Sequence, residues 1–169
     1  RLAAELLNMK FVDVDDYIEK KEGKTIKKIF EQNGEWLFRK LEKEAVKELC
    51  ESDNMVLAPG GGAVMIEENT ANLKHNGFVV LLETDAETIH SRLKLDTDRL
   101  TQRPDLTDKD PLEEIKHMLE IRKPVYQSAA DIKIDTSSTS IEEISKIVVA
   151  EFKNKMGNKP KKWGSGGQG

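Results

Sequence analysis

Residues 77–83 read Gly-Phe-Val-Val-Leu-Leu-Glu, and every residue between the glycine and the glutamate is apolar. A strand with one face in water alternates apolar and polar residues, whereas a strand covered on both faces does not. Double coverage is typical of parallel sheets, whose strands are joined by crossover helices. The stretch therefore predicts a parallel sheet with helices on both of its faces.

The segments on either side of this strand alternate between strand and helix patterns. Compact apolar runs predict further strands at residues 10–14, 55–58 and 131–135. Helical patterns lie between them, at residues 2–7, 16–21, 25–32, 35–50, 67–75, 85–94, 112–129 and 141–152. Asp16 and Glu19 form a capping pattern at the start of the helix over 16–21, and Gly34 separates the next two helices. The alternation indicates a three-layer α/β fold, with a parallel sheet flanked by helices.

Two segments show no periodic pattern. Residues 96–111 are polar and hold two prolines, so we expect a mobile loop that is long enough to act as a lid. Residues 153–169 turn to glycine, lysine and serine, the composition of a flexible tail. We therefore expect one domain over residues 1–152, followed by a flexible tail over 153–169.

Composition excludes several classes of protein. The net charge of −4 argues against a nucleic-acid-binding protein, which needs a basic surface. No apolar run approaches the roughly 20 residues that span a bilayer, so we expect a soluble protein without a membrane partner. Cys50 is the only cysteine, which rules out an internal disulfide and favours the reducing cytoplasm.

The first predicted strand ends in two carboxylates, Asp13 and Asp15. Ligands of open parallel sheets bind at the carboxyl ends of strands, and strand alternation would place both aspartates on one face. Together they could hold a metal ion and a substrate hydroxyl. Alternatively, Asp15 only caps the following helix, although Asp16 can already serve as that cap.

The second predicted strand ends in three successive glycines, Gly60, Gly61 and Gly62. Glycine tolerates positive φ and has no side chain, so the backbone here could approach a ligand closely. The alternative is a flexible exit from the strand. The run does not match either glycine-rich phosphate-binding fingerprint.

Three arginines are further candidates, and each has an ordinary explanation. Arg39 has Glu35 four residues before it and Glu42 three residues after it, so it could form only a surface ion pair. Arg103 and Arg122 each lie near a proline and could be solvated loop residues.

Taken together, these motifs follow an order that resembles the shikimate kinase family. The order runs FVDVD (11–15), GEWLFRKLE (34–42), APGGG (58–62), RPDL (103–106) and RKPVY (122–126), with Ala130-Asp131 and Ile134-Asp135-Thr136 after it. The resemblance covers nearly all of residues 1–152. It implies a P-loop kinase fold and ATP-dependent phosphorylation of shikimate to shikimate 3-phosphate, a step of aromatic amino acid (chorismate) biosynthesis.

The resemblance also implies roles for individual residues. Asp13 matches the aspartate that supports the Mg²⁺ site, and Asp15 matches the one that contacts the hydroxyl receiving the phosphoryl group. The expected substrate-binding residues are Asp15, Arg39, Gly60, Gly61, Gly62 and Arg122, with both arginines on the shikimate carboxylate. Arg103 matches a catalytic lid arginine that also contacts ATP, and Arg92 is expected near adenine. We expect a monomer whose partners are small molecules.

Two features depart from the family. The G-x-x-x-x-G-K-[ST] loop and the strand before it would precede Arg1, and no such motif occurs in the sequence. We therefore expect a sheet that lacks its first strand and an activity that is impaired. Pro59 stands where many members carry a small hydroxyl residue. The alternatives are a kinase of another small acid such as gluconate, and a non-catalytic protein that binds shikimate.

Overall fold

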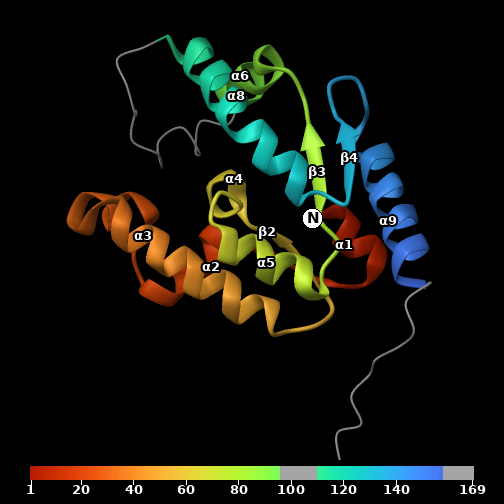
Figure 1. Cartoon of the computed structure of the whole chain (residues 1–169), viewed down its shortest axis with the longest axis horizontal. Coiled ribbons are helices and arrows are strands. Elements are labelled where there is room, and N and C mark those ends of the chain that lie inside the picture. Colours follow the sequence, from red (N-terminus) through yellow and green to blue (C-terminus); the bar gives the residue numbers. More distant parts are fainter. Residues whose placement is uncertain (96–109, 158–169) are drawn as a thin grey trace, which may run out of the picture.

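The computed structural model describes residues 1–95 and 110–157 as alternating helices and parallel strands (Figure 1). This arrangement confirms the predicted α/β class. The elements are α1 (Leu2–Leu7), β1 (Lys10–Asp13), α2 (Val14–Glu22), α3 (Ile26–Cys50), β2 (Met55–Ala58), α4 (Gly60–Ala63), α5 (Glu67–Asn76), β3 (Val80–Glu83), α6 (Ala86–Leu95), α8 (Pro111–Ala129), β4 (Ile132–Asp135) and α9 (Ile141–Gly157).

The four described strands form two parallel pairs rather than one continuous sheet. β1 pairs with β2, with Phe11 opposite Val56, and β3 pairs with β4, with Leu82 opposite Ile134. A hollow of about 2270 Å³ is lined by all four residues of β2 and all four of β3, but by only one residue each of β1 and β4. The free edges of β2 and β3 therefore border this hollow, which separates the two pairs.

The pair β1–β2 belongs to an N-terminal half with a well-packed core. Helix α3 presents apolar residues at helical spacing and packs against α2 and α5, and Thr25 caps its first turn by accepting from the Lys28 N–H at 3.3 Å. Gly34 leaves the helical conformation at φ 74°, so the predicted separation of two helices is present as a kink. The buried core residues are Val12, Val14, Ile18, Ile26, Ile29, Phe38, Ala45, Val46, Leu49 and Ala63.

The pair β3–β4 belongs to a C-terminal half, with α6, α8 and α9, that buries fewer large side chains. Leu82 of β3 is 55% exposed and Ile141 of α9 is 71% exposed. The Asp131 carboxylate ties this half together, because it accepts from the Val79 N–H at 2.7 Å and pairs with Lys155 of α9. Helix α1 contacts β1, β2 and α9, so it links the two halves.

The start of α2 differs from the prediction. The strand ends at Asp13, and the Asp13 carboxylate caps α2 by accepting from the Asp15 N–H at 3.0 Å. The predicted cap at Asp16 is therefore wrong, because α2 has already begun at Val14. Glu19, the other half of the expected capping pattern, accepts instead from the Ile26 N–H at 2.7 Å, which fixes the junction between α2 and α3.

The two non-periodic segments have different outcomes. Residues 96–109, which make up most of the expected lid, lie outside the described residues, as do 158–169. Helix α9 continues to Gly157, so residues 153–157 are helical where we expected the tail to have begun. Within the described part of the chain, no helix is long and apolar enough to cross a membrane.

Candidate functional site

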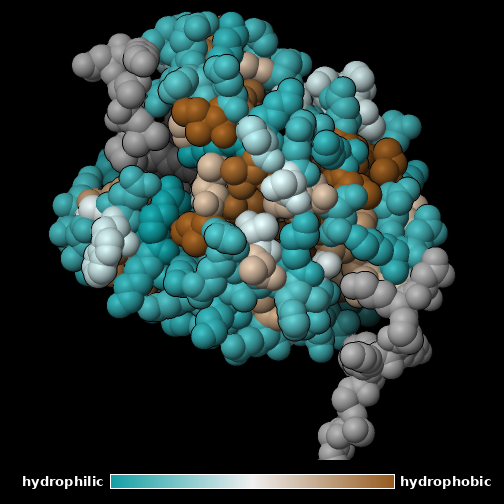
Figure 2. All heavy atoms as spheres, in the orientation of Figure 1, coloured by the Kyte–Doolittle hydropathy of each residue, from teal (hydrophilic) through white to brown (hydrophobic). Residues whose placement is uncertain are grey.

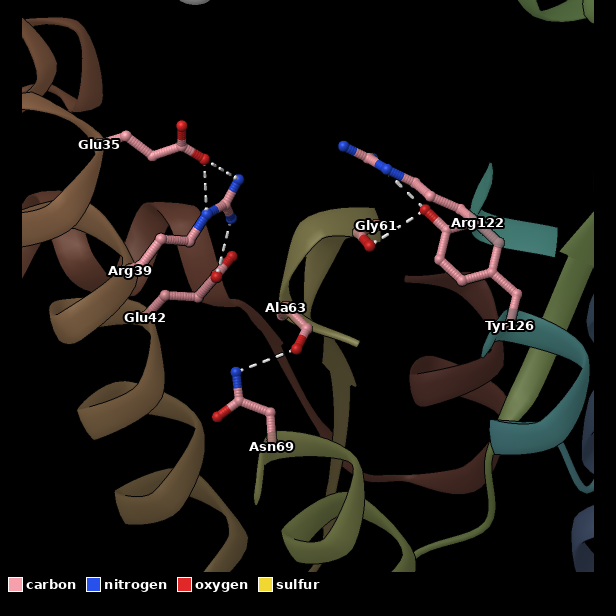
Figure 3. A network of polar contacts seen from close by, with 8 residues as sticks. All are labelled: Glu35, Arg39, Glu42, Gly61, Ala63, Asn69, Arg122 and Tyr126. Atoms are coloured by element: carbon pink, nitrogen blue, oxygen red, sulfur yellow. Dashed lines mark hydrogen bonds and ion pairs between the residues drawn. The ribbon is translucent and has the colours of Figure 1, made fainter. Parts of the chain in front are cut away.

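A cavity of about 330 Å³ lies where the two halves meet, beside α4. Arg39 reaches it from α3 and Arg122 from α8, so the structure brings together two of the predicted arginines (Figure 3). Figure 2 shows apolar side chains reaching the surface in the middle of the face that it draws. The lining residues are Glu35, Arg39, Gly62, Met65, Ile66, Met118, Ile121 and Arg122.

Two carboxylates hold the Arg39 guanidinium. The Arg39 Nε donates to Glu35 Oε1 at 3.0 Å and Nη1 donates to Glu42 Oε2 at 2.9 Å. Burial by itself would lower the pKa of Arg39, but hydrogen bonds and charge attraction from Glu42 and Glu35 outweigh it and raise the pKa above its ordinary value. Arg39 therefore stays charged at the cavity.

The alternative that Arg39 forms only a surface ion pair fits its contact with Glu35 but is wrong for its contact with Glu42. The Glu35 side chain is 62% exposed, as in a surface pair, whereas the Glu42 side chain is only 3% exposed and the Arg39 side chain 32%. A buried carboxylate is costly without a partner, so Glu42 fixes the guanidinium far more firmly than an exposed acid would. Arg39 is therefore pre-positioned before any ligand arrives.

Each of the three glycines has its own steric reason. Gly60 adopts φ 74°, a backbone conformation that residues other than glycine rarely adopt. A Cβ on Gly61 would lie 2.5 Å from the Tyr126 hydroxyl, and a Cβ on Gly62 would lie 2.4 Å from Arg39 Nη1. Both separations are far below van der Waals contact, so side chains from two other helices occupy the space that a larger residue would need. The alternative of a flexible strand exit does not account for this fit.

Arg122 lies on the opposite wall, next to Tyr126. The Tyr126 hydroxyl donates to the Gly61 carbonyl at 3.0 Å, and Arg122 Nη1 lies 3.5 Å from the same hydroxyl oxygen. Arg122 lies inside α8, four residues before Tyr126, so both project from the same helix face. The alternative that Arg122 is a solvated loop residue is therefore wrong.

Asn69 holds the glycine-rich turn from below. Its side chain is fully buried, and its Nδ2 donates to the Ala63 carbonyl at the end of α4 at 3.0 Å (Figure 3). The Ile66 N–H donates to the same carbonyl at 3.2 Å, so Asn69 adds a side-chain bond to the turn that ends α4. Asn69 of α5 therefore fixes α4 between Arg39 and Tyr126.

The predicted metal-site residues lie at the carboxyl end of β1. Asp13 is the last residue of the strand, while Asp15 lies in the first turn of α2, so strand alternation does not relate the two as we predicted. Among the residues that the structure describes, no group of three His, Cys, Asp or Glu side chains could hold a metal ion. Mg²⁺ is commonly held by one or two carboxylates together with waters and substrate phosphates, so the donor type at this strand end still fits that ion.

Of the two remaining predicted residues the structure describes only Arg92, which is not among the residues that line the cavity. Arg92 of α6 donates to the Thr136 hydroxyl at 3.0 Å and to the Thr136 carbonyl at 2.6 Å, at the rim of the larger hollow. This placement separates it from Arg39 and Arg122. Arg103 lies outside the described residues.

Sequence reasoning did not single out Glu42, Asn69 or Tyr126 as site residues. Glu42 was visible only as one of two acids near Arg39, and its spacing is that of an ordinary surface pair. Tyr126 was visible as the last residue of the RKPVY motif, whose contact with Gly61 spans 65 positions. Asn69 carried no signal, because the polar helix around it reads as solvent-exposed.

Comparison with known proteins identifies the family. The family model described as shikimate kinase matches residues 1–153. A shikimate kinase of Sulfurihydrogenibium sp. (strain YO3AOP1) is 40% identical over 155 residues, which cover 92% of this chain and 89% of the relative. A shikimate kinase of Symbiobacterium thermophilum is 38% identical over 156 residues, covering 92% of this chain and 86% of the relative.

Solved structures agree with the sequence relatives. The shikimate kinase of Acinetobacter baumannii, solved in complex with shikimate, has a TM-score of 0.79 at 36% identity and covers 95% of this chain and 86% of its own. The shikimate kinase of Bacteroides thetaiotaomicron has a TM-score of 0.76 at 28% identity, with coverage of 92% and 88%. The matched fold, the matched length and the two arginines at one cavity lead to one conclusion: the chain belongs to the shikimate kinase family.

Proposed function

We propose that this chain binds shikimate in the 330 Å³ cavity and is built for its ATP-dependent phosphorylation, the step that yields shikimate 3-phosphate in aromatic biosynthesis. The observation that carries the proposal is the convergence of Arg39 and Arg122 on one cavity from separate helices. Guanidinium groups match a carboxylate with paired hydrogen bonds, and two of them can hold it from two sides.

The wall between the arginines favours a cyclic acid over a linear polyol acid. Met65, Ile66, Met118 and Ile121 give that wall an apolar surface. A ring presents a compact apolar face that can pack there, whereas gluconate carries a hydroxyl on nearly every carbon and would leave some of them without partners. Gluconate is therefore the weaker candidate for the acceptor.

Asp15 is our candidate for the group that receives the proton of the attacking hydroxyl. It lies in the first turn of α2, two residues after the carboxyl end of β1, the edge at which ligands of parallel sheets bind. A carboxylate within hydrogen-bond reach can orient the hydroxyl and accept its proton as the phosphoryl group moves. Asp15→Asn would then lower turnover much more than shikimate affinity.

Mg²⁺, Arg103 and Arg92 complete the proposed machinery for ATP. Asp13 would hold the metal, which when bound neutralises charge on the phosphates. Arg103 remains our candidate for a phosphate contact, and Arg92 for a contact near adenine. Because the sequence contains no G-x-x-x-x-G-K-[ST] motif, we assign no β-phosphate cradle to the described residues.

A monomer in the cytoplasm, without nucleic-acid partners, is part of the same proposal. The single cysteine supports the cytoplasm, and the net charge of −4 supports the absence of nucleic-acid partners. Sedimentation of the purified chain tests the monomer, because a dimer would sediment at twice the mass.

Calorimetric titration of this chain with shikimate and with gluconate tests the substrate. We expect shikimate to bind, gluconate to bind at least 10-fold more weakly, and either Arg39→Ala or Arg122→Ala to raise the shikimate Kd by 10-fold or more. Lys27→Ala, on the exposed face of the same helix as Arg39, is the matched control and should leave the shikimate Kd unchanged. Release of ADP with shikimate, Mg²⁺ and ATP then reports phosphoryl transfer. Equal binding of both acids would contradict the proposed acceptor.

A further inference from the structure

One hydroxyl group links α4 and α8, the helices that contribute Gly62 and Arg122 to the cavity. The Tyr126 hydroxyl donates to the Gly61 carbonyl at 3.0 Å and lies 3.5 Å from Arg122 Nη1 (Figure 3). Gly61 belongs to α4, which follows β2 in the N-terminal half, whereas Tyr126 and Arg122 belong to α8 in the C-terminal half. The hydroxyl therefore contacts the backbone of the N-terminal half and a positively charged side chain of the C-terminal half.

The next residue of the turn is fitted just as closely to the other arginine. The space where Gly62 would carry a Cβ is taken by Arg39, whose Nη1 lies 2.4 Å from that position. A continuous line of contacts thus runs from Arg39 past Gly62 and Gly61 to Tyr126 and Arg122. Because every step is in contact, the line sets the distance between the two guanidinium groups.

We infer that Tyr126 is a positioning residue: its hydroxyl spaces Arg122 from Arg39 so that both guanidinium groups can bind one carboxylate. The inference rests on the proposed function, because it assumes that the ligand is a carboxylic acid held by both arginines. Tyr126 itself need not touch the ligand. Its effect is to hold Arg122 in place before binding, which lowers the ordering that binding would otherwise require.

The variant Tyr126→Phe removes the hydroxyl and keeps the ring. We expect the shikimate Kd to rise about 3- to 10-fold. This is the range for the loss of one hydrogen bond, and here the lost bond acts on the ligand through Arg122. The methyl ester of shikimate lacks the negative charge that the paired arginines recognise, so its Kd should change less than 2-fold. The matched control is Tyr17→Phe, which alters the only other tyrosine, on α2.

A second pair of variants tests the close contact itself. Gly61→Ala places a methyl group at the position 2.5 Å from the Tyr126 hydroxyl oxygen, but 3.5 Å from the ring carbon that carries it. We expect Gly61→Ala alone to weaken shikimate binding at least 10-fold by pushing Tyr126 away. In the double variant with Tyr126→Phe the clash is gone, so the loss should be smaller than in Gly61→Ala alone.

The outcomes separate the inference from the proposed function. If the unchanged chain binds neither shikimate nor its ester, both are wrong. If it binds shikimate and Tyr126→Phe binds it equally well, only the inference is wrong. Equal losses for shikimate and the ester would mean that Tyr126 merely supports the fold, and that result would also overturn the inference. A selective loss for shikimate, with partial rescue of Gly61→Ala by Tyr126→Phe, supports it.

Discussion

The two halves of the chain differ in how firmly they hold their part of the cavity. The N-terminal half contains the buried cluster around Val46 and Ile29, and its arm, Arg39, is anchored by the buried acid Glu42. In the C-terminal half Leu82 is 55% exposed, and its arm, Arg122, has a 3.5 Å contact with Tyr126. Arg39 is therefore fixed within its own half, whereas Arg122 depends, through Tyr126, on the bond from the Tyr126 hydroxyl to the Gly61 carbonyl of the other half.

Matched core truncations give the largest expected contrast. Ile29→Ala removes a side chain that is 2% exposed and leaves a cavity, so we expect a loss of about 2–5 kcal/mol in the free energy of unfolding. Leu82→Ala removes a side chain that is 55% exposed and should cost less than about 1 kcal/mol. Urea denaturation followed by circular dichroism measures both. Equal losses would show that the halves are packed equally well.

The anchoring of Arg39 can be tested by neutralising each of its two acids. Glu42→Gln leaves a half-buried guanidinium with a weakened partner, so we expect about 1–3 kcal/mol less stability and a higher shikimate Kd. Glu35→Gln is the matched control for stability, because that side chain is 62% exposed and such pairs contribute about 0–1 kcal/mol. Thermal unfolding of the two variants and of the unchanged chain measures both losses of stability. If Glu35→Gln were the more costly change, the buried acid would not be the anchor.

Most of the helices and strands were visible in the sequence, because they leave periodic patterns, but the contrast between the two halves was not predicted. The apolar runs predicted all four described strands, and Gly34 marked the kink in α3. The capping of α2 was mispredicted because Asp13, Asp15 and Asp16 are chemically equivalent candidates, and only the backbone path decides which carboxylate meets a free N–H.

The site was predicted as a set of residues but not as a geometry. Arg39, Arg122 and the glycines were identified from motifs, and the structure places both arginines and Gly62 at one cavity. The roles of Glu42 and Tyr126 depend on burial and on a contact across 65 positions. Such contacts are set by the packing of helices from different parts of the chain, which local patterns do not specify.

Because the C-terminal half buries fewer large side chains, we expect its stability to depend on one ion pair, between Asp131 and Lys155. Burial alone would raise the pKa of Asp131, but the bond from Lys155 and the Val79 N–H outweigh it and hold the pKa below its ordinary value. A lowered pKa in the folded state means that Asp131 stabilises the fold above its unfolded pKa of about 4, and that this stability is lost as the pH falls through the lower, folded value.

Asp131→Asn should therefore lower the free energy of unfolding by about 1 kcal/mol at pH 7, the scale of one charged hydrogen bond that is partly exposed to water. The difference from the unchanged chain should shrink steadily below pH 4, since protonation then removes the same charge from Asp131 itself. Urea denaturation of both chains at pH 7 and pH 3 makes the comparison. A difference that stayed constant over this range would mean that the charge on Asp131 does not hold α9 near Val79, the residue before β3, and that other contacts keep the C-terminal half together.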